Sequence, residues 1–206
     1  MGRMPQPPSL STGPLPKGTF QPRRLPAVGK RVKVETEHYS LHSLEPADAT
    51  PVLQGWFRDD SILESMNVSP LAWSIPELQA FIGTFDNSTR FIIGIRAKPS
   101  STLIGFYTVS INRRHRIAQF TAAVGDKAHW GKGVLTETTR ALVEHMFTTR
   151  GVEKMYARVV STNKRIIFNL ANSTMFQLEG TLRQEILAPD GKRLDVLSFA
   201  CLKPAR

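Results

Sequence analysis

The chain has 206 residues, of which 41% are hydrophobic, and its formal net charge at pH 7 is +10. This length predicts one domain with a buried core, or one domain plus a tail. The single cysteine, Cys201, excludes an internal disulfide and fits a reducing compartment, so we expect a cytoplasmic protein. No run of about 18 apolar residues occurs, which excludes a helix that spans a membrane.

The first 30 residues differ in composition from the rest of the chain. They hold seven prolines and five Lys or Arg residues, with no acidic residue. Proline removes backbone donors and keeps its predecessor out of a helix, so we predict a disordered basic tail over residues 1–30 and one folded domain over 31–206. Half of the net charge lies in this tail. The folded part lacks basic clusters interleaved with aromatic residues, so we do not expect a nucleic-acid partner.

Residue patterns in the first half of the folded part predict a strand followed by two helices. Alternating apolar residues predict a strand over residues 39–44. A helix is predicted over residues 46–58, where Pro51 fits poorly, and residues 59–73 have the composition of a loop. Ser74 and Glu77 then form the signature of a capping box, which predicts a short helix directly after it.

Strands dominate the second half. The expected strands cover residues 90–96, 102–111, 115–124, 152–160, 175–187 and 193–202. Two helices are expected, over residues 135–149 and 163–172. The order predicts an α+β fold with a mostly antiparallel sheet, in which the β-α-β unit over 115–160 supplies one parallel pair.

The segment with the most chemical information is the loop over residues 125–133, which follows a strand and opens a helix. Gly131 and Gly133 allow a tight turn that exposes consecutive amides. Those amides and the positive end of the helix dipole favour a phosphate or pyrophosphate, and Lys132 adds a mobile positive charge. Glycines before a helix also occur in ordinary turns; the strand–loop–helix order favours the phosphate site.

Several segments together resemble a known family. Residues 130–137 (WGKGVLTE) resemble the acyl-coenzyme A loop of the GNAT acetyltransferases, and residues 175–180 (MFQLEG) resemble the entry to a late strand of that fold. Asp195-Val196 is similar to the closing strand of the RimJ/RimL branch. The resemblance covers residues 36–204. It implies the GNAT (acyl-CoA N-acyltransferase) fold and transfer of an acetyl group from acetyl-CoA to a primary amine, either a protein N-terminus or a small molecule.

The resemblance also implies where acetyl-CoA binds. A strand edge would pair with the pantetheine arm and supply the oxyanion donor, and the glycine loop would hold the pyrophosphate. The expected cofactor-binding residues are Thr121, Ala122, Ala123, Val124, Trp130, Gly131, Lys132, Gly133, Val134, Leu135 and Asn163. Lys164 or Arg165 is a candidate for the adenosine phosphate.

For catalysis, the resemblance places Glu179 as the general base, with Asp195 as a second candidate. Tyr107 and Ser110 are candidate acid donors. The five histidines lack the spacing of metal ligands, so we expect no metal. The choice of acceptor amine is expected to depend on residues 57–75 and on the last hairpin.

The chain also departs from the family pattern. Ile166 stands where the family usually has a serine hydroxyl, and Met175 stands where glycine usually closes the helix. Leu135 is larger than the usual last residue of the loop. One alternative is therefore an inactive GNAT domain that binds acyl-CoA or a partner protein. A second alternative is a small RNA-associated basic protein. The sequence also leaves open whether the chain forms a homodimer.

Overall fold

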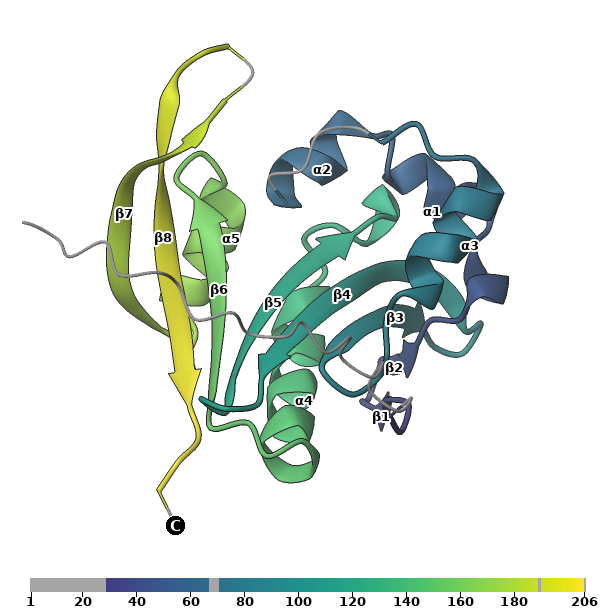
Figure 1. Ribbon diagram of the computed structural model, residues 1–206, viewed down its shortest axis with the longest axis horizontal. Helices are drawn as coiled ribbons and strands as arrows, with labels where there is room; N and C mark the ends of the chain where they lie inside the picture. Colours follow the sequence, from purple (N-terminus) through teal and green to yellow (C-terminus); the bar gives the residue numbers. More distant parts are fainter. Residues whose placement is uncertain (1–28, 67–70, 189, 206) are drawn as a thin grey trace, which may run out of the picture.

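Eight strands form one sheet in the order β1-β2-β3-β4-β5-β6-β8-β7 (Figure 1). The computed structural model describes residues 29–66, 71–188 and 190–205. The strands are β1 (Lys33–Glu35), β2 (Tyr39–Ser43), β3 (Arg90–Ala97), β4 (Thr102–Asn112), β5 (Ile117–Val124), β6 (Lys154–Val160), β7 (Gln177–Leu187) and β8 (Arg193–Leu202). All neighbours pair antiparallel except β5 and β6, which confirms the predicted parallel pair.

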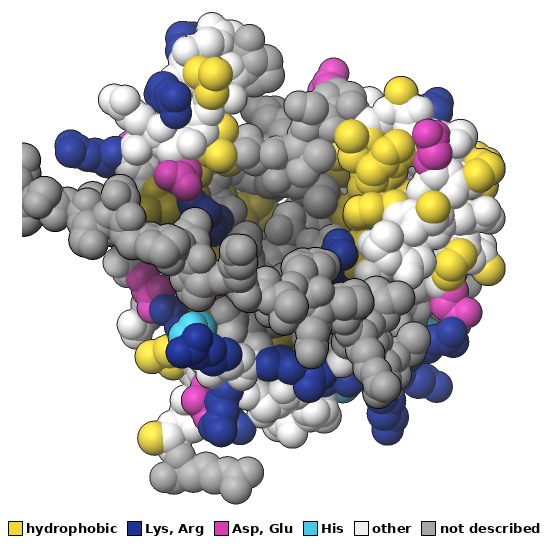
Figure 2. Space-filling view, in the orientation of Figure 1, with side chains coloured by type: hydrophobic (Ala, Val, Ile, Leu, Met, Phe, Trp, Pro, Cys, Tyr) yellow, Lys and Arg dark blue, Asp and Glu magenta, His cyan; other side chains and the backbone are white. Residues whose placement is uncertain are grey.

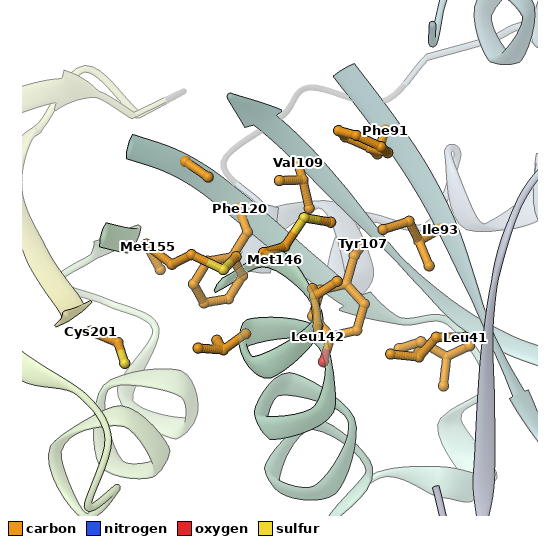
Figure 3. Close-up of a cluster of buried hydrophobic side chains, with 14 of the residues drawn as sticks. Leu41, Phe91, Ile93, Tyr107, Val109, Phe120, Leu142, Met146, Met155 and Cys201 are labelled. Carbon is orange, nitrogen blue, oxygen red and sulfur yellow. The ribbon is translucent and has the colours of Figure 1, made fainter. Parts of the chain in front are cut away.

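Helices cover both faces of this sheet. They are η1 (Pro46–Asp48), α1 (Pro51–Trp56), α2 (Asp60–Met66), α3 (Ile75–Gly83), η2 (Lys127–His129), α4 (Val134–Thr149) and α5 (Lys164–Ala171). Side chains of successive strand residues point to opposite faces. Tyr107 therefore packs in a core with α4 residues such as Leu142 (Figure 3), whereas its neighbour Phe106 packs in a second core with α1 residues such as Trp56. The predicted α+β architecture is confirmed.

The start of the helical region differs from its prediction. The helix expected over 46–58 is two elements, because Thr50 begins a new helix by accepting a hydrogen bond from the Leu53 N–H (3.3 Å). Pro51 then occupies the first turn, where its missing N–H costs nothing. The loop expected over 59–73 was wrong for its first part, which is α2; residues 67–70 lie outside the described residues.

Two other elements bear on the sequence predictions. The Ser74–Glu77 capping box is confirmed, since the Glu77 carboxylate accepts from the Ser74 N–H at 2.7 Å. Residues 1–28 of the predicted tail lie outside the described residues, while the Gly29 N–H donates to the Asp86 carbonyl at 2.7 Å. In the described part of the chain, no helix is long and apolar enough to cross a bilayer.

The sheet divides at the parallel pair. Pairing between β5 and β6 runs from Ile117↔Lys154 to Gln119↔Tyr156 and stops there, although both strands continue. Beyond that point β5 pairs only with β4, and β6 pairs only with β8. The two halves of the sheet consequently diverge, as Figure 1 shows, and we call the point of divergence the fork.

One glycine links the end of β5 to the helical core. A Cβ on Gly125 would lie 2.0 Å from the indole of Trp56, which is buried and stacks on Phe106. We predict that Gly125→Ala lowers the free energy of unfolding by about 1–3 kcal/mol, because the ring must shift within a packed core. Urea denaturation of purified protein measures this.

The matched control is Gly55→Ala in α1, where no atom lies within 4 Å of the added Cβ. Alanine is favoured over glycine in a helix by about 0.5–1 kcal/mol, so this variant should be neutral or more stable. Equal stabilities for the two variants would contradict the packing at Gly125.

Candidate functional site

Beyond the fork, one edge of β5 has backbone groups that no strand pairs. The Gly125 N–H donates to the Ile104 carbonyl of the β4 side at 2.9 Å. Residues of an antiparallel pair alternate between hydrogen-bonded and non-hydrogen-bonded positions. Counting back from Gly125, Ala122 and Val124 therefore direct their N–H and C=O groups away from β4, toward β6. This edge offers hydrogen bonds to a ligand that enters the fork.

Trp130 takes up part of this edge. Its indole Nε1–H donates to the Val124 carbonyl at 2.8 Å, so that acceptor is already bound. Within the described part of the chain, the groups left for a ligand are the Val124 N–H and both backbone groups of Ala122. An extended amide chain, such as pantetheine, fits this arrangement because it carries both donors and acceptors.

The start of α4 supplies a second set of donors next to this edge. Gly131 and Gly133 have φ values of +75° and +73°, a conformation that side chains disfavour. Gly133 is the N-cap and brings no capping side chain. The N–H groups of Val134, Leu135 and Thr136 have no acceptor within the helix. Such free N–H groups at a helix N-terminus bind phosphate.

Two cavities adjoin the fork. The first, of about 370 Å³, lies between β5, β6, α4 and α5. The second, of about 300 Å³, is lined by the glycine loop and the start of α4. Residues that line both are Ala122, Leu135, Thr136, Ile166 and Asn169. The strand edge and the free N–H groups thus face neighbouring cavities with a shared wall.

Most of the predicted cofactor-binding residues line these cavities. Thr121 lines the first, Ala122 and Leu135 line both, and the second is lined by Val124, Trp130, Gly131, Gly133 and Val134. Three predicted residues line neither cavity. Ala123 is buried in the core beside α1, Lys132 is exposed, and Asn163 is the N-cap of α5, where its side chain accepts from the Ile166 N–H at 3.2 Å.

Two cations lie over Trp130, which lines the second cavity. Arg165 of α5 lies 4.3 Å from the ring centroid, and Lys127 lies 5.8 Å from it. Lys127 also pairs with Asp59 at 2.6 Å and, with the Ser61 hydroxyl, lowers the pKa of Asp59 to about 2. Of the two cations considered for the phosphate, Arg165 lines the cavity. Residues from the loop and from α5 thus meet at one aromatic ring, and Lys127 links the ring to Asp59 before α2.

Tyr107, a predicted acid donor, lies beneath the site in a directed chain of hydrogen bonds. Thr138 donates its hydroxyl to the Val134 carbonyl (2.7 Å), so it accepts from the Tyr107 hydroxyl (2.7 Å). Tyr107 in turn accepts from Thr139 (2.8 Å), and its burial raises its pKa to about 12. The proton of Tyr107 is therefore held inside the core, and Thr139 presents lone pairs to the first cavity. Ser110, the other predicted donor, is exposed on β4.

The two predicted bases lie on the last hairpin, outside both cavity linings. Glu179 forms an ion pair with Lys154 of β6, with Nζ–O distances of 2.7 and 2.6 Å. The Asp195 carboxylate accepts from the Gln184 N–H at 2.8 Å. Each carboxylate already has a partner, and the roles of Glu179 and Asp195 as bases stay predictions.

Comparison with known proteins identifies the family. Residues 39–168 match the sequence profile described as the acetyltransferase (GNAT) domain. The chain belongs to the GNAT family. It is therefore an N-acetyltransferase of a family that uses acetyl-CoA, as predicted.

Individual relatives agree with this assignment. The chain is similar to the "Uncharacterized N-acetyltransferase p20" of Bacillus licheniformis, with 29% identity over 175 residues, 82% of this chain and 94% of the relative. Spermidine N-acetyltransferase from Vibrio cholerae, solved with CoA and spermine, superposes with a TM-score of 0.71 at 23% identity, covering 80% of this chain and 95% of the other. Ribosomal-protein-S5-alanine acetyltransferase from Vibrio fischeri gives a TM-score of 0.67 at 19% identity, with coverages of 84% and 100%. The two superpositions confirm the predicted GNAT fold, and at these low identities they show the fold alone.

Some residues near the site were not predicted from the sequence. Ile62 of α2 and His129 line the second cavity, and Arg158 of β6 lines the first. Strand alternation in 152–160 places Arg158 on the face opposite Ala157, but it did not show that Arg158 reaches the gap beside this strand. The position of α2 was missed with the helix itself.

We predict that acetyl-CoA raises the melting temperature of the protein, and that valine at both Gly131 and Gly133 abolishes the shift. A ligand at about 100 times its Kd stabilises the native state by about 2.7 kcal/mol. No atom lies within 4 Å of an added Cβ at either glycine, so the loss would come from the positive φ values that shape the loop.

Gly151→Val is the matched control. Gly151 also has a positive φ, +68°, and open surroundings, but it follows the opposite end of α4. This variant should lower the melting temperature of the free protein and keep the acetyl-CoA shift. A shift that survives in the double variant would refute the phosphate site.

Proposed function

We propose that the chain transfers an acetyl group from acetyl-CoA to a primary amine by direct attack in a ternary complex. The observation that carries the proposal is the unpaired β5 edge beside the free N–H groups of α4. A thioester ligand needs both, since its pantetheine arm carries amides and its other end carries phosphates. Arg165 adds a cation at the mouth of the second cavity, where phosphates would lie.

The reaction requires the protein to position the reactants, to remove two protons from the acceptor nitrogen and to allow one to reach the thiolate. The ammonium of the acceptor loses one proton and attacks the thioester carbonyl, and the N–C bond forms as the carbon becomes tetrahedral. The N–H of Ala122 or Val124 stabilises the oxyanion. The C–S bond then breaks. The nitrogen loses a second proton, and the thiolate takes up one to give the free thiol.

The acceptor is either a protein N-terminus, as in the RimJ/RimL branch, or a small-molecule amine. The motif around Asp195 and the structural similarity to a ribosomal-protein-alanine acetyltransferase support the first. The similarity to a spermidine acetyltransferase supports the second. A turnover screen of peptides and amines with acetyl-CoA separates them.

The inactive-domain alternative has one observation in its favour. Ile166 lines both cavities where the family usually has a serine, so this helix position offers no hydroxyl to the thiolate. A protein of this kind would bind acetyl-CoA and release no CoA with any amine. The same turnover screen, combined with calorimetric measurement of acetyl-CoA binding, distinguishes the two functions.

We predict that Glu179→Gln lowers kcat by about 10²–10⁴-fold, the usual effect of losing a general base, and leaves acetyl-CoA affinity within about twofold. The change also removes the ion pair with Lys154, so Lys154→Gln is the control that breaks the pair and keeps the carboxylate. Steady-state kinetics at saturating acetyl-CoA, across pH, measure both variants. Small and equal losses in the two would show that Glu179 serves only the ion pair.

A further inference from the structure

One face of β6 carries a row of polar side chains, each with a partner. Ala157 and Val159 pack in the core with α4, so Lys154, Tyr156 and Arg158 point to the opposite face. Lys154 pairs with Glu179, and the Tyr156 hydroxyl donates to Gln119 at the fork (3.1 Å).

Arg158 is the member of this row that reaches the gap in the sheet. It lines the first cavity, and its Nη2 donates to the Glu185 carboxylate of β7 at 2.5 Å. The ion pair therefore lies at the edge of the fork, on the face opposite α4.

Glu185 reaches Arg158 because β7 bulges at this point. Between the pairs Leu182↔Val196 and Ile186↔Leu194, three residues of β7, 183–185, lie opposite the single residue Asp195 of β8. Gln184 at the centre of the bulge has a φ of +51°. Its N–H donates to Asp195, and its carbonyl accepts from Arg193 at 3.3 Å. Bulges re-aim side chains and are common beside active sites.

The charge of this half of the sheet argues against a polycationic acceptor. Strands β6, β7 and β8 carry four Lys or Arg residues and three acidic residues. Figure 2 shows the two kinds side by side over β7 and β8. All three carboxylates, Glu179, Glu185 and Asp195, already bind a cation or a backbone N–H. A polyamine that bound Glu185 would leave Arg158 without a partner, next to the positive charges of the polyamine.

We propose that Arg158 and Glu185 form the recognition site for a zwitterionic acceptor, a small amine that carries a carboxylate next to its ammonium group, as an α-amino acid does. The pair opens, Arg158 takes the carboxylate in a bidentate contact and Glu185 takes the ammonium. A ligand with both charges leaves neither side chain uncompensated, whereas an amine or an acid alone strands one of them. This assignment rests on the proposed acetyl transfer and names its acceptor class.

The test compares acceptors that differ only in the carboxylate. Each of the twenty amino acids is assayed beside its carboxamide, with spermidine and an alanine-initiated tripeptide, at saturating acetyl-CoA. We expect turnover of one or more amino acids, with kcat/KM about 10- to 100-fold higher than for the matching amide, the range for a hydrogen bond to a charged group. Spermidine and the tripeptide should fall at or below the amides.

Variants assign this preference to the pair. Arg158→Gln should lower kcat/KM for the amino acid about 10- to 100-fold and change that for the amide less than about threefold, so the ratio collapses. Arg158→Lys, which keeps the charge and loses the bidentate geometry, should give an intermediate ratio. Arg116→Gln is the control, because it breaks a similar exposed pair with Glu153, and neither residue lines a cavity. Acetyl-CoA affinity, measured by calorimetry, should stay unchanged in all three and shows that each variant is folded.

The outcomes separate the two levels of the argument. The zwitterion site would be overturned if amides, spermidine or the tripeptide reacted as well as the amino acids. It would also be overturned if Arg158→Gln kept the ratio of kcat/KM between amino acid and amide. Either result would leave acetyl transfer intact. Failure of every acceptor with a protein that binds acetyl-CoA would overturn the proposed function, and the acceptor class with it.

Discussion

The ladder between β5 and β6 ends at the pair Gln119↔Tyr156, and the site depends on that early end. Backbone N–H and C=O groups that lose a strand partner must find another, because leaving them buried and unpaired is costly. The edge beyond the fork is therefore a fixed set of donors and acceptors that a ligand can complete. Tyr156 and Gln119 hold the last pair together through their side chains, which sets where the opening begins.

The loop that follows β5 adapts this edge to one kind of ligand. Trp130 binds the last carbonyl of the strand, so the first open group on this edge is the Val124 N–H. The same ring lies against Arg165 from α5, on the other side of the opening. A cation over an indole face is attracted to the ring quadrupole and keeps its hydrogen-bond donors free. The contact thus holds Arg165 in place and leaves its N–H donors available to an anion.

The features that could be predicted from the sequence are those that depend on local chemistry. Gly131 and Gly133 before a helix indicated a phosphate loop, because their freedom at positive φ and the helix N-terminus are local properties. Ser74 and Glu77 indicated a helix start for the same reason. Sequence reasoning missed α2, whose Ile62 and Leu63 are buried only through contacts with the rest of the fold, and β1, which is three residues long.

The acceptor side of the site was beyond sequence prediction for a different reason. The Arg158–Glu185 pair depends on a three-residue bulge and on Gln184 at a φ of +51°, a conformation for which glutamine carries no signal. A resemblance covered the position of Glu179, whereas no sequence pattern pointed to Glu185, the partner of Arg158. Where a strand is irregular, the sequence does not show which side chains face the site, because every inserted residue changes the alternation.

An ion pair at this position suits a recognition site better than a single bare charge would. Arg158 and Glu185 are 36% and 43% exposed, and pairs in such surroundings contribute roughly 0–1 kcal/mol. Opening the pair therefore costs little, while each charge remains balanced in the free protein. The two faces of β6 have different roles. Ala157 and Val159 pack in the core with α4, and Arg158 forms a weak, exchangeable ion pair on the other face.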